Sequence, residues 1–582
     1  MVRLPSPAGV AILRTRVPRA WLALAVYAAL AVVVFSGAWT DPAGTWIGDN
    51  KDPKLFIWYL GWIPHELGQG LNPLVTDYLS HPPGVNLMWN SSIIFPALIL
   101  WPVTAAFGPV VSYNVLITVS VALSAWLAYL AARRFVDSLA ACLFAGFLYG
   151  FSPGIMAQAL GHPHALIAVF PPIVLILGHE VLVAQRRSPW LLGFLAGLAA
   201  VLQLLTGEEV LATTALIALL GTGLAALLHR DAVRAKLPYA ARAVGAAAVT
   251  FGILAAYPLG LQFLGPQRVF GSVQAPDVYV TDVLGFIVPS QVMLQNSFTR
   301  DIAGHLAGNR TENDAYVGIP LLILFTLAAF IGWRRAPIKW FALMTLCIAT
   351  LSLGPHLHLL GWRTWIPLPW AAIQTLPLMG SALPSRLMLV AFLGIGVVAA
   401  GLWDARLDGG RRRPLGIGLL LVASLATVFP MIPAQSTRAA VPRFFQTGGE
   451  VSALPQGAVI VVTPFSSRQS TDAMYWQTVA NYRFRMPEGD AFTPGPYLGP
   501  HPSHIQASLD ALDQGQAIAI TQQERELAVR DLSYFQAKAI VVGPSPGQGA
   551  IVRYLTAVLG SAPIETEGVY VWWRLSLPTP VA

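Results

Sequence analysis

The sequence predicts a polytopic α-helical membrane protein with a small C-terminal α/β domain. Hydrophobic residues make up 55% of the 582 positions, charged residues make up only 11%, and the mean hydropathy is +0.60. Soluble globular chains of this length are far more polar. Apolar stretches recur along the chain until about Ala434, where the composition becomes that of a soluble domain. Together these observations predict a helical bundle in the membrane followed by a domain in water.

Apolar stretches of roughly 17 to 25 residues predict about eleven membrane crossings. The first crossing covers residues 21–38 and follows Arg3, Arg14, Arg16 and Arg19. Because no convincing signal-peptidase cleavage site follows it, we expect it to be a retained membrane anchor. The other spans have the approximate limits 112–132, 138–154, 165–184, 189–206, 210–228, 238–260, 316–333, 338–355, 386–403 and 414–433. The stretch 93–107 contains Pro96 and Pro102 and is expected to be an interfacial or re-entrant helix.

Basic residues occupy every second connection between these spans. The clusters are Arg133 and Arg134, Arg186 and Arg187, Arg230 with Arg234 and Lys236, Arg334 and Arg335 with Lys339, and Arg406 with Arg411 to Arg413. The positive-inside rule therefore places these loops and the N-terminus in the cytoplasm and the C-terminal domain outside. Because the net charge of +8 follows this alternation, a nucleic-acid partner is not expected. Richness in Arg, Ala and Gly favours a bacterial source, hence a bacterial plasma membrane.

Two domains follow from this topology. Residues 1–433 form the membrane domain, with a first outer loop at 39–92 and a large outer loop at 261–315. Residues 434–582 form the extracytoplasmic α/β domain. In the latter, 459–462, 539–542 and 569–573 are predicted as short buried strands, and 506–539 has helical character. Cys142 and Cys347 both lie in apolar stretches, so neither a disulfide framework nor a thiolate metal site is expected.

The first outer loop carries the sequence Gly48-Asp49-Asn50-Lys51-Asp52-Pro53. Asp52 has a structural explanation, because it is suited to cap an interfacial helix that has Pro53 at its first position and runs to about Leu67. Asp49 has no such explanation and is the first choice for a catalytic carboxylate, although a solvated loop aspartate is the alternative. The tryptophans of this loop suit an aromatic belt at the level of the lipid headgroups. These are Trp39, Trp46, Trp58, Trp62 and Trp89.

Histidines and glutamates mark the next two outer connections. His162 and His164 suit a metal or the hydrogen bonding of a phosphate, whereas an interface pair is the plain alternative. Glu208 and Glu209 begin a span, and adjacent positions on a helix point in different directions, so one of them is expected to face the bundle. Their structural alternative is a pair of carboxylates favoured by the helix dipole.

Charges at the two later outer loops suggest an anionic ligand. Arg310 is suited to bind a phosphate, with Glu312 or Asp314 orienting the guanidinium. Arg386 enters a span from the outer side and so breaks the positive-inside pattern, which favours an anionic partner there. The chain contains no Walker A sequence, no dinucleotide fingerprint and no His-Glu-x-x-His motif, which argues against an ATP-driven pump.

The chain resembles the GT-C superfamily of integral-membrane glycosyltransferases. The resemblance rests on an aspartate shortly after the first span, on interfacial helices, on the many-span bundle and on the C-terminal outer domain. It is most similar to bacterial members of that superfamily. The matching stretches are 48–53, Gly70-Leu71-Asn72-Pro73, Pro83-Gly84-Val85-Asn86-Leu87, Gly161-His162 and Glu312 before Tyr316.

The resemblance implies transfer of a hexosyl or pentosyl group from a polyprenyl-phosphate donor to a glycan, lipid or protein of the cell envelope. Asp49 or Asp52 would act as the general base on the acceptor hydroxyl. The departing phosphate needs donors, for which Arg310, Arg386, His162 and His164 are candidates. Glu208, Glu209 and Glu312 complete the set of residues expected to bind the donor phosphate or another part of the substrates. A divalent metal is possible, but no decisive ligand set is present. The spacing Asp-x-x-Asp departs from adjacent acids and leaves open which aspartate acts.

Two other functions compete with this interpretation. One is a catalytically silent scaffold whose outer domain recruits envelope partners. The other is a lipid or solute transporter, which commonly has paired internal repeats and broken helices near the midplane. No internal repeat is evident here, and the acidic residues gather at the ends of the predicted spans. These features favour the enzyme over the transporter.

Overall fold

The computed structural model describes residues 7–271, 277–293, 297–313, 315–407, 415–465, 470–494 and 502–573, together with 575 and 577. The chain divides into two compact units. The helical unit contains residues 1–41, 114–256 and 274–436, and the mixed unit contains residues 42–113, 257–273 and 437–582. The first outer loop thus belongs to the same unit as the C-terminal segment.

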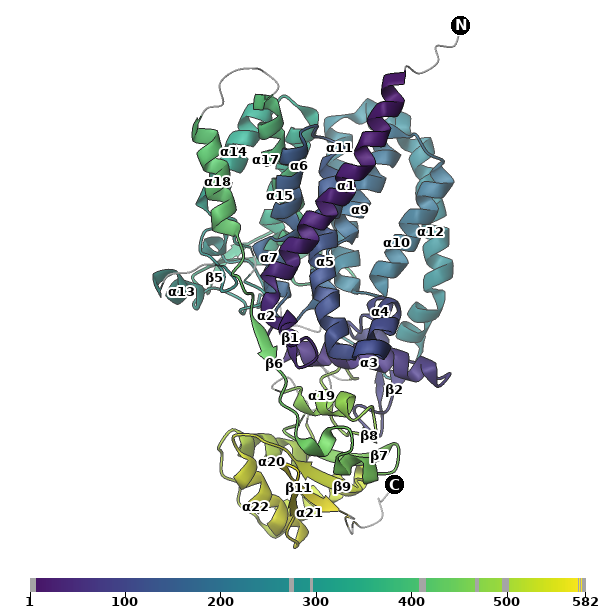
Figure 1. Ribbon diagram of the computed structural model, residues 1–582, viewed down its shortest axis with the longest axis vertical. Coiled ribbons are helices and arrows are strands. Elements are labelled where there is room, and N and C mark those ends of the chain that lie inside the picture. Colours follow the sequence, from purple (N-terminus) through teal and green to yellow (C-terminus); the bar gives the residue numbers. More distant parts are fainter. Residues whose placement is uncertain are drawn as a thin grey trace. The chain divides into compact units, whose positions relative to one another are not determined.

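Long apolar helices make up the helical unit (Figure 1). Its helices are α1 (Pro7–Val34), α2 (Ser36–Trp39), α5 (Pro109–Ala132), α6 (Leu139–Gly150), α7 (Pro153–Gln158), α8 (Pro163–Leu166), α9 (Phe170–His179), α10 (Pro189–Leu204), α11 (Glu208–Leu228), α12 (Arg230–Leu264), α13 (Ser297–Ala303), α14 (Ile319–Gly332), α15 (Ala336–Ser352), α16 (Trp370–Ile373), α17 (Met388–Leu407) and α18 (Leu415–Val428). A hairpin of β4 (His356–Leu359) and β5 (Trp362–Pro367) precedes α16. Helices α5 and α12 each continue from one unit into the other.

Each of the eleven predicted spans coincides with one of these apolar helices, so the predicted fold class is confirmed. Six helical segments of the described chain are long and apolar enough to cross a membrane: 109–132, 139–158, 163–184, 208–228, 230–264 and 384–403. The predicted spans that remain correspond to the shorter apolar helices 19–34, 189–204, 319–332, 336–352 and 416–428. Large apolar side chains on α11, α12 and α14 are exposed, among them Leu227, Ile253 and Phe330. Exposure of this kind suits lipid contact.

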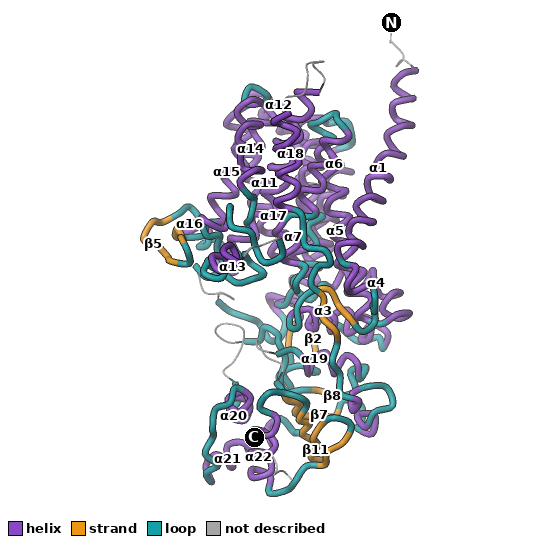
Figure 2. Tube along the Cα trace, turned by 60° about the vertical axis from the view of Figure 1, so that its left-hand side comes forward, coloured by secondary structure: helices purple, strands orange, loops and turns teal. Residues whose placement is uncertain are grey.

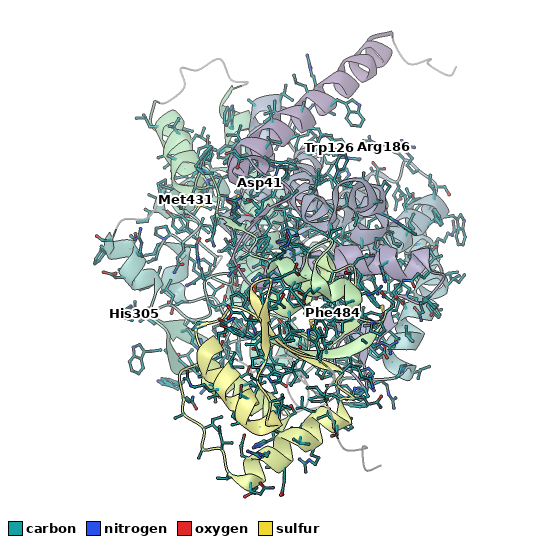
Figure 3. All side chains as sticks on the ribbon, turned by 60° about the horizontal axis from the view of Figure 1, so that its bottom comes forward. Asp41, Trp126, Arg186, His305, Met431 and Phe484 are labelled. Carbon is teal, nitrogen blue, oxygen red and sulfur yellow. The ribbon has the colours of Figure 1, made fainter. Side chains whose placement is uncertain are left out.

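Small residues allow close approach between helices of the bundle. A Cβ atom added to Gly150 on α6 would lie 2.6 Å from the backbone nitrogen of Ala125 on α5. Gly146, one turn earlier, would meet the Ala125 carbonyl oxygen at the same distance. Such small-residue contacts bring helix backbones together in membranes, where van der Waals packing replaces the hydrophobic effect. Near the C-terminal end of α5, Trp126 stacks on Trp21 of α1 with ring centroids 5.7 Å apart (Trp126 is labelled in Figure 3).

The C-terminal part of the mixed unit is a five-stranded sheet in the order β10-β11-β9-β7-β8. Its strands are β7 (Ala458–Thr463), β8 (Phe484–Arg485), β9 (Ala539–Val542), β10 (Ile564–Thr566) and β11 (Val569–Trp573). Strands β8 and β9 both run parallel to β7, whereas β11 is antiparallel to β9. The three predicted strands therefore exist, and the predicted helical stretch forms α20 (His504–Asp513) and α21 (Gln522–Tyr534).

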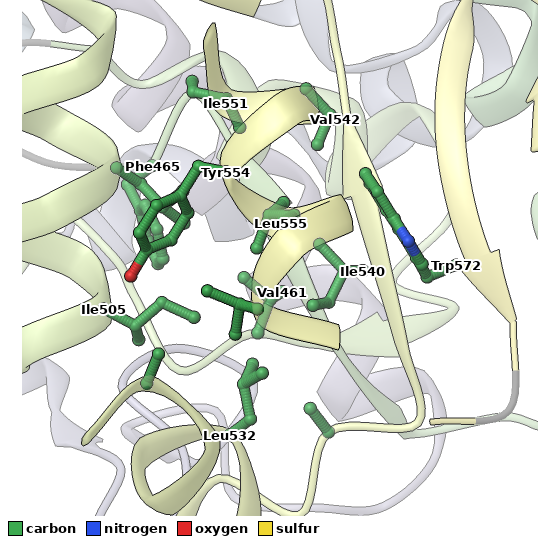
Figure 4. Close-up of a cluster of buried hydrophobic side chains, with 14 of the residues drawn as sticks. Val461, Phe465, Ile505, Leu532, Ile540, Val542, Ile551, Tyr554, Leu555 and Trp572 are labelled. Atoms are coloured by element: carbon green, nitrogen blue, oxygen red, sulfur yellow. The ribbon is translucent and has the colours of Figure 1, made fainter. Parts of the chain in front are cut away.

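One apolar core holds this sheet to its helices. Figure 4 shows Val461 of β7 and Ile540 of β9 facing Leu532 of α21 and Leu555 of α22 (Gln548–Leu559). Alternate residues of a strand share a face, so β7 contributes Val461 to this side. Helix α19 (Asp472–Val479) adds no residue to this cluster and instead packs against α3 (Asp52–Gly68) of the first outer loop.

The remaining elements of the mixed unit belong to the first outer loop: β1 (Thr45–Ile47), β2 (Val75–Thr76), β3 (Val85–Asn86) and α4 (Ile94–Phe107). Strand β6 (Ser436–Arg438) pairs with β1. The predicted aromatic belt is wrong for Trp46, Trp58 and Trp62, which are at most 1% exposed. Trp58 donates to the side-chain oxygen of Gln477 on α19 at 2.6 Å, and the Tyr482 hydroxyl donates to the Trp58 carbonyl at 2.8 Å. These tryptophans are core residues because the C-terminal segment covers them.

Candidate functional site

A buried ion cluster in the helical unit contains five of the predicted site residues. Nε and Nη2 of Arg386 donate to the two carboxylate oxygens of Glu312 at 3.0 and 2.5 Å. Nη1 donates to Glu209 and lies 3.3 Å from Nε2 of His164. Nδ1 of His162 lies 3.6 Å from Glu312. The Arg386 and Glu312 side chains are only 9% and 2% exposed, so this is a bidentate pair in a largely dry environment.

Local structure brings these side chains together from four parts of the chain. Arg386 lies in the 3-10 turn Pro384–Leu387 that leads into α17, and Glu209 lies in the first turn of α11. Glu209 also accepts from the backbone N–H of Leu383 at 2.7 Å, which ties this turn to α11. His162 is the N-cap residue of α8. Glu312 lies in the loop before α14. The ion cluster thus joins the ends of several helices.

Gln158, at the end of α7, is a member of the ion cluster that the sequence did not single out. Its Nε2 donates to the Thr311 carbonyl at 2.9 Å and lies 3.3 Å from the Glu312 carboxylate. The side chain is fully buried. The available signal was a glutamine within the apolar stretch 155–160, four positions before His162, because a polar side chain that becomes buried there must be satisfied within the fold.

The structure corrects two expectations about the charged residues. Glu312 pairs with Arg386, not with Arg310, whose Nη2 donates to Gln435 at 2.5 Å. The anionic partners expected for Arg386 are carboxylates of the chain itself. Of the two glutamates on α11, Glu209 faces the ion cluster. Asp314 lies outside the described residues.

The charge state of Glu312 gives a pH prediction. Burial alone raises the pKa of this carboxyl, but the Arg386 guanidinium and His162 outweigh burial and hold the pKa below its ordinary value of 4.5. Glu312 therefore contributes stability fully above about pH 4.5, and this contribution is lost as the pH falls through the lowered value. We expect the difference in melting temperature between wild type and Glu312→Gln to be large at neutral pH and to shrink below pH 4.5. A difference that stays constant across this range would contradict the assignment.

A cavity of about 100 Å³ lies beside Arg310. Ser290, Gln291, Asn309 and Asn313 supply its other polar walls, in the loops around α13 (teal in Figure 2). The Ser290 side chain is buried, and its hydroxyl has no hydrogen-bond partner among the described residues. A cation, amides and an unsatisfied hydroxyl around one cavity suit an oxygen-rich anion.

Asp49 lies in the mixed unit, between β1 and α3. Its Oδ1 accepts from the backbone N–H of Lys51 at 2.9 Å, and its carbonyl accepts from the Trp46 indole at 2.6 Å. Gly48 adopts a φ of 109°, which L side chains rarely adopt, so glycine is required at this turn. Asp52 is the first residue of α3 and Lys51 is the N-cap residue, so the predicted capping role of Asp52 is wrong by one position.

The C-terminal segment fastens this aspartate loop through side-chain bonds. Thr437 donates to the Gly48 carbonyl at 2.8 Å, and Thr471 donates to the Lys51 carbonyl at 2.6 Å. The ammonium of Lys54, a residue only 2% exposed, lies 2.5 Å from Asp472 and 5.8 Å from the centre of the Trp46 ring. Lys54 and Asp472 are not among the residues predicted for the site. A lysine within the apolar start of α3 was the only signal.

Within the described ranges, no group of three or more His, Cys, Asp or Glu side chains is arranged to hold a metal ion. His162 and His164 have ring centroids 5.7 Å apart and lie beside a guanidinium, which is a poor neighbour for a cation. The described residues therefore offer no ready fit to the divalent metal that the resemblance left possible.

The fold of this chain is similar to the folds of solved glycosyltransferases, among them an archaeal oligosaccharyltransferase and an arabinofuranosyltransferase. The archaeal oligosaccharyltransferase AglB from Archaeoglobus fulgidus, in complex with an inhibitory peptide and a dolichol-phosphate, matches with a TM-score of 0.54 at 12% identity, over 93% of this chain and 71% of AglB. The arabinofuranosyltransferase AftD from Mycobacteria matches with a TM-score of 0.54 at 13% identity. This match covers 96% of this chain and 42% of AftD. ArnT from Cupriavidus metallidurans, bound to undecaprenyl phosphate, matches with a TM-score of 0.45 at 12% identity, over 95% of this chain and 97% of ArnT.

The chain belongs to the family described as Domain of unknown function (DUF6311), whose model matches residues 23–426. No curated protein matches the sequence. The matched range includes every residue of the ion cluster, and it includes Asp49 and Asp52.

Proposed function

We propose that this protein transfers a sugar from a polyprenyl-phosphate donor to an acceptor of the cell envelope. The observation that carries the proposal is the fastened loop of Asp49, in a chain with the GT-C fold. The Asp49 carboxylate accepts from the Lys51 N–H, and two threonines hold the loop backbone on either side of it, so the carboxylate loses little freedom when it acts, which favours catalysis. The dolichol-phosphate in the AglB complex supports a lipid-phosphate donor. The proposed location is a bacterial plasma membrane with the N-terminus in the cytoplasm and the C-terminal segment outside.

The chemistry assigns one step to a first-loop carboxylate. Asp49, or alternatively Asp52, accepts the proton of the acceptor hydroxyl, and the acceptor oxygen attacks the anomeric carbon of the donor. The bond from that carbon to the phosphate oxygen breaks, and polyprenyl phosphate leaves with the electron pair. As a separate proposal within the helical unit, Arg310, Ser290 and the amides of their cavity are suited to bind a phosphate.

The ion cluster has a supporting role in this proposal. Its guanidinium is already neutralised by Glu209 and Glu312, and binding a phosphate there would require one carboxylate to leave. Arg386, His162, His164 and Glu209 are therefore proposed as positioning residues for the helix ends. Glu208, which lies on the same first turn of α11, is proposed to assist substrate binding.

The test follows radiolabelled sugar from polyprenyl-phosphate donors to endogenous acceptors, in membranes containing wild type, Asp49→Asn or Asp52→Asn. We expect Asp49→Asn to reduce transfer by roughly 10²- to 10⁴-fold, which is the usual contribution of a general base. Asp41→Asn is the matched control, because Asp41 is an exposed aspartate at the start of the same outer loop (labelled in Figure 3). Equal expression and melting temperature establish that each variant is folded.

Other outcomes separate the competing functions. Transfer that survives both substitutions would leave an enzyme but remove the first-loop base. Absence of transfer by wild type with hexosyl and pentosyl donors would favour an envelope scaffold or a transporter. The possible dependence on a divalent metal is tested by adding a chelator to the wild-type reaction.

A further inference from the structure

The carboxyl edge of β7 is a topological switch point in the mixed unit. From β7 the chain passes through α19 to β8 on one side, and then through α20 and α21 to β9 on the other side. Both neighbours run parallel to β7. In open α/β sheets, ligands bind outside the carboxyl ends of the strands at the point where the connections diverge. By its position, the carboxyl edge of β7 is therefore a candidate ligand site.

Three unsatisfied polar atoms lie at this edge. Oγ1 of Thr463, Oε2 of Glu488 and Oγ of Ser545 are buried and have no hydrogen-bond partner in the described part of the chain. Thr463 is 1% exposed and Glu488 is 3% exposed. A buried polar group without a partner costs about 1–3 kcal/mol, and native proteins seldom leave several together without a reason. A ligand with matching hydrogen-bond groups would supply that reason.

Backbone contacts place these groups on neighbouring elements. Thr463 ends β7, and its carbonyl accepts at 2.8 Å from Gly543, which begins the loop containing Ser545. Strand β8 stops at Arg485, and beyond it Oε1 of Glu488 accepts from the N–H of Val462 at 3.3 Å, so this side chain occupies the open edge of β7. Thr463 shares the face of Val461, where the apolar core of Figure 4 lies.

Helix α20 supplies two further carboxylates. Asp513 accepts from the N–H of Gly547 at 2.9 Å, in the loop that contains Ser545. Asp510 interacts electrostatically with both Glu488 and Asp513, and it remains partly exposed. Burial raises the pKa of Glu488 well above its usual range, and burial together with Asp513 raises the pKa of Asp510 to about 6. The edge therefore offers carboxyl groups that can both donate and accept hydrogen bonds.

The chemistry of these groups selects the ligand. With a pKa of about 6, Asp510 is mostly ionised at neutral pH and so repels phosphates and other anions, whereas hydroxyl and carboxyl groups gain little from an apolar ligand. Sugar hydroxyls are suited to them, because each hydroxyl can donate to a carboxylate and accept from Thr463 or Ser545. We propose that the carboxyl edge of β7 and β9 binds an uncharged sugar residue of the acceptor. Only the identification of this sugar as the acceptor rests on the proposed transferase function.

Saturation-transfer NMR tests sugar binding without any donor. The full-length protein in nanodiscs would be mixed with glucose, galactose, mannose and maltose. We expect saturation-transfer signals from at least one of these sugars. Thr463→Val should raise the Kd of that sugar by roughly 3- to 10-fold, which corresponds to the loss of one hydrogen bond. Thr556→Val is the matched control, because the Thr556 hydroxyl bonds to its own helix at Val552. Ser545→Ala, in the partly exposed loop, provides a second variant should Thr463→Val fail to fold.

Three results would overturn the proposal. These are no signal from any of the four sugars, equal affinity of wild type and both hydroxyl variants, and stronger binding of glucose 6-phosphate than of glucose. Binding of radioactive calcium that Glu488→Gln abolishes, without a sugar signal, would identify a cation site instead. The Asp49→Asn variant separates the two proposals, because it should lose transfer and keep the sugar signal.

Discussion

Replacing Arg386 with methionine is expected to lower the free energy of unfolding of the helical unit by about 3–5 kcal/mol, the usual cost of removing one partner of a buried ion pair. Methionine keeps much of the length of the arginine side chain but leaves the Glu312 carboxylate, which is 2% exposed, without its bidentate partner. Glu209 loses a donor as well. The measurement is the melting temperature and the inactivation half-life of the purified protein in nanodiscs, because membrane proteins often unfold irreversibly.

Arg363→Met is the matched control for this substitution. The Arg363 side chain also pairs with a carboxylate, that of Asp277 at 2.8 Å, but it is 55% exposed. Exposed pairs contribute about 0–1 kcal/mol, so this variant should behave almost like wild type. The double variant Arg386→Met with Glu312→Gln should recover part of the loss, since it removes the buried charge. Equal effects of Arg386→Met and Arg363→Met would show that the ion cluster is not a stability determinant.

Replacing Lys54 with methionine is expected to reduce sugar transfer by about 10²-fold, mainly through kcat. The Lys54–Asp472 pair joins the start of α3 to the start of α19, next to the loop of Asp49. Without the pair, small displacements of this loop become possible, and a displacement near 1 Å can cost a factor of about 10² in rate. Donor titrations with the radiolabelled assay give kcat and KM separately, and melting temperatures report on folding.

Lys538→Met is the control, because Lys538 is an exposed lysine of the same unit. Asp472→Asn keeps a hydrogen-bond acceptor for Lys54 but removes the charge, so its kcat should lie between those of wild type and Lys54→Met. A rise in KM for the donor at unchanged kcat would instead place Lys54 in donor binding and contradict a positioning role.

Sequence periodicity and composition were sufficient for the helices and for three strands of the sheet. A membrane-spanning helix can be recognised from the hydropathy of its own residues, because all its backbone hydrogen bonds are made within the segment. The strands of residues 459–462, 539–542 and 569–573 were visible as short apolar runs for a similar local reason. Strand β8 has only two residues and was missed, since no pattern of alternation can develop over such a length.

The candidate site was predictable in its residues but not in its pairings. Arg386 was visible because it violates the positive-inside rule, and Glu312 because it lies in a loop next to a span. Their bond joins residues 74 positions apart, and the Lys54–Asp472 bond joins residues 418 positions apart. Charge patterns along a chain do not encode such partners, because only tertiary packing decides which carboxylate reaches which cation. For the same reason, the sequence suggests an aromatic belt at the lipid headgroups for Trp46, Trp58 and Trp62, which tertiary packing buries instead.

The covering of α3 by the C-terminal segment makes the order of synthesis relevant to folding. Residues 42–113 are complete about 320 residues before residue 437 is made. At the usual rate of about 5–20 residues per second, that interval lasts roughly 15 to 65 seconds. During it, Trp58 and Trp62 lack the side chains of Gln477 and Tyr482 that contact them in the finished protein. A ribosome that stalls before residue 437 would therefore leave these aromatic rings as a surface for quality-control proteases and chaperones to recognise.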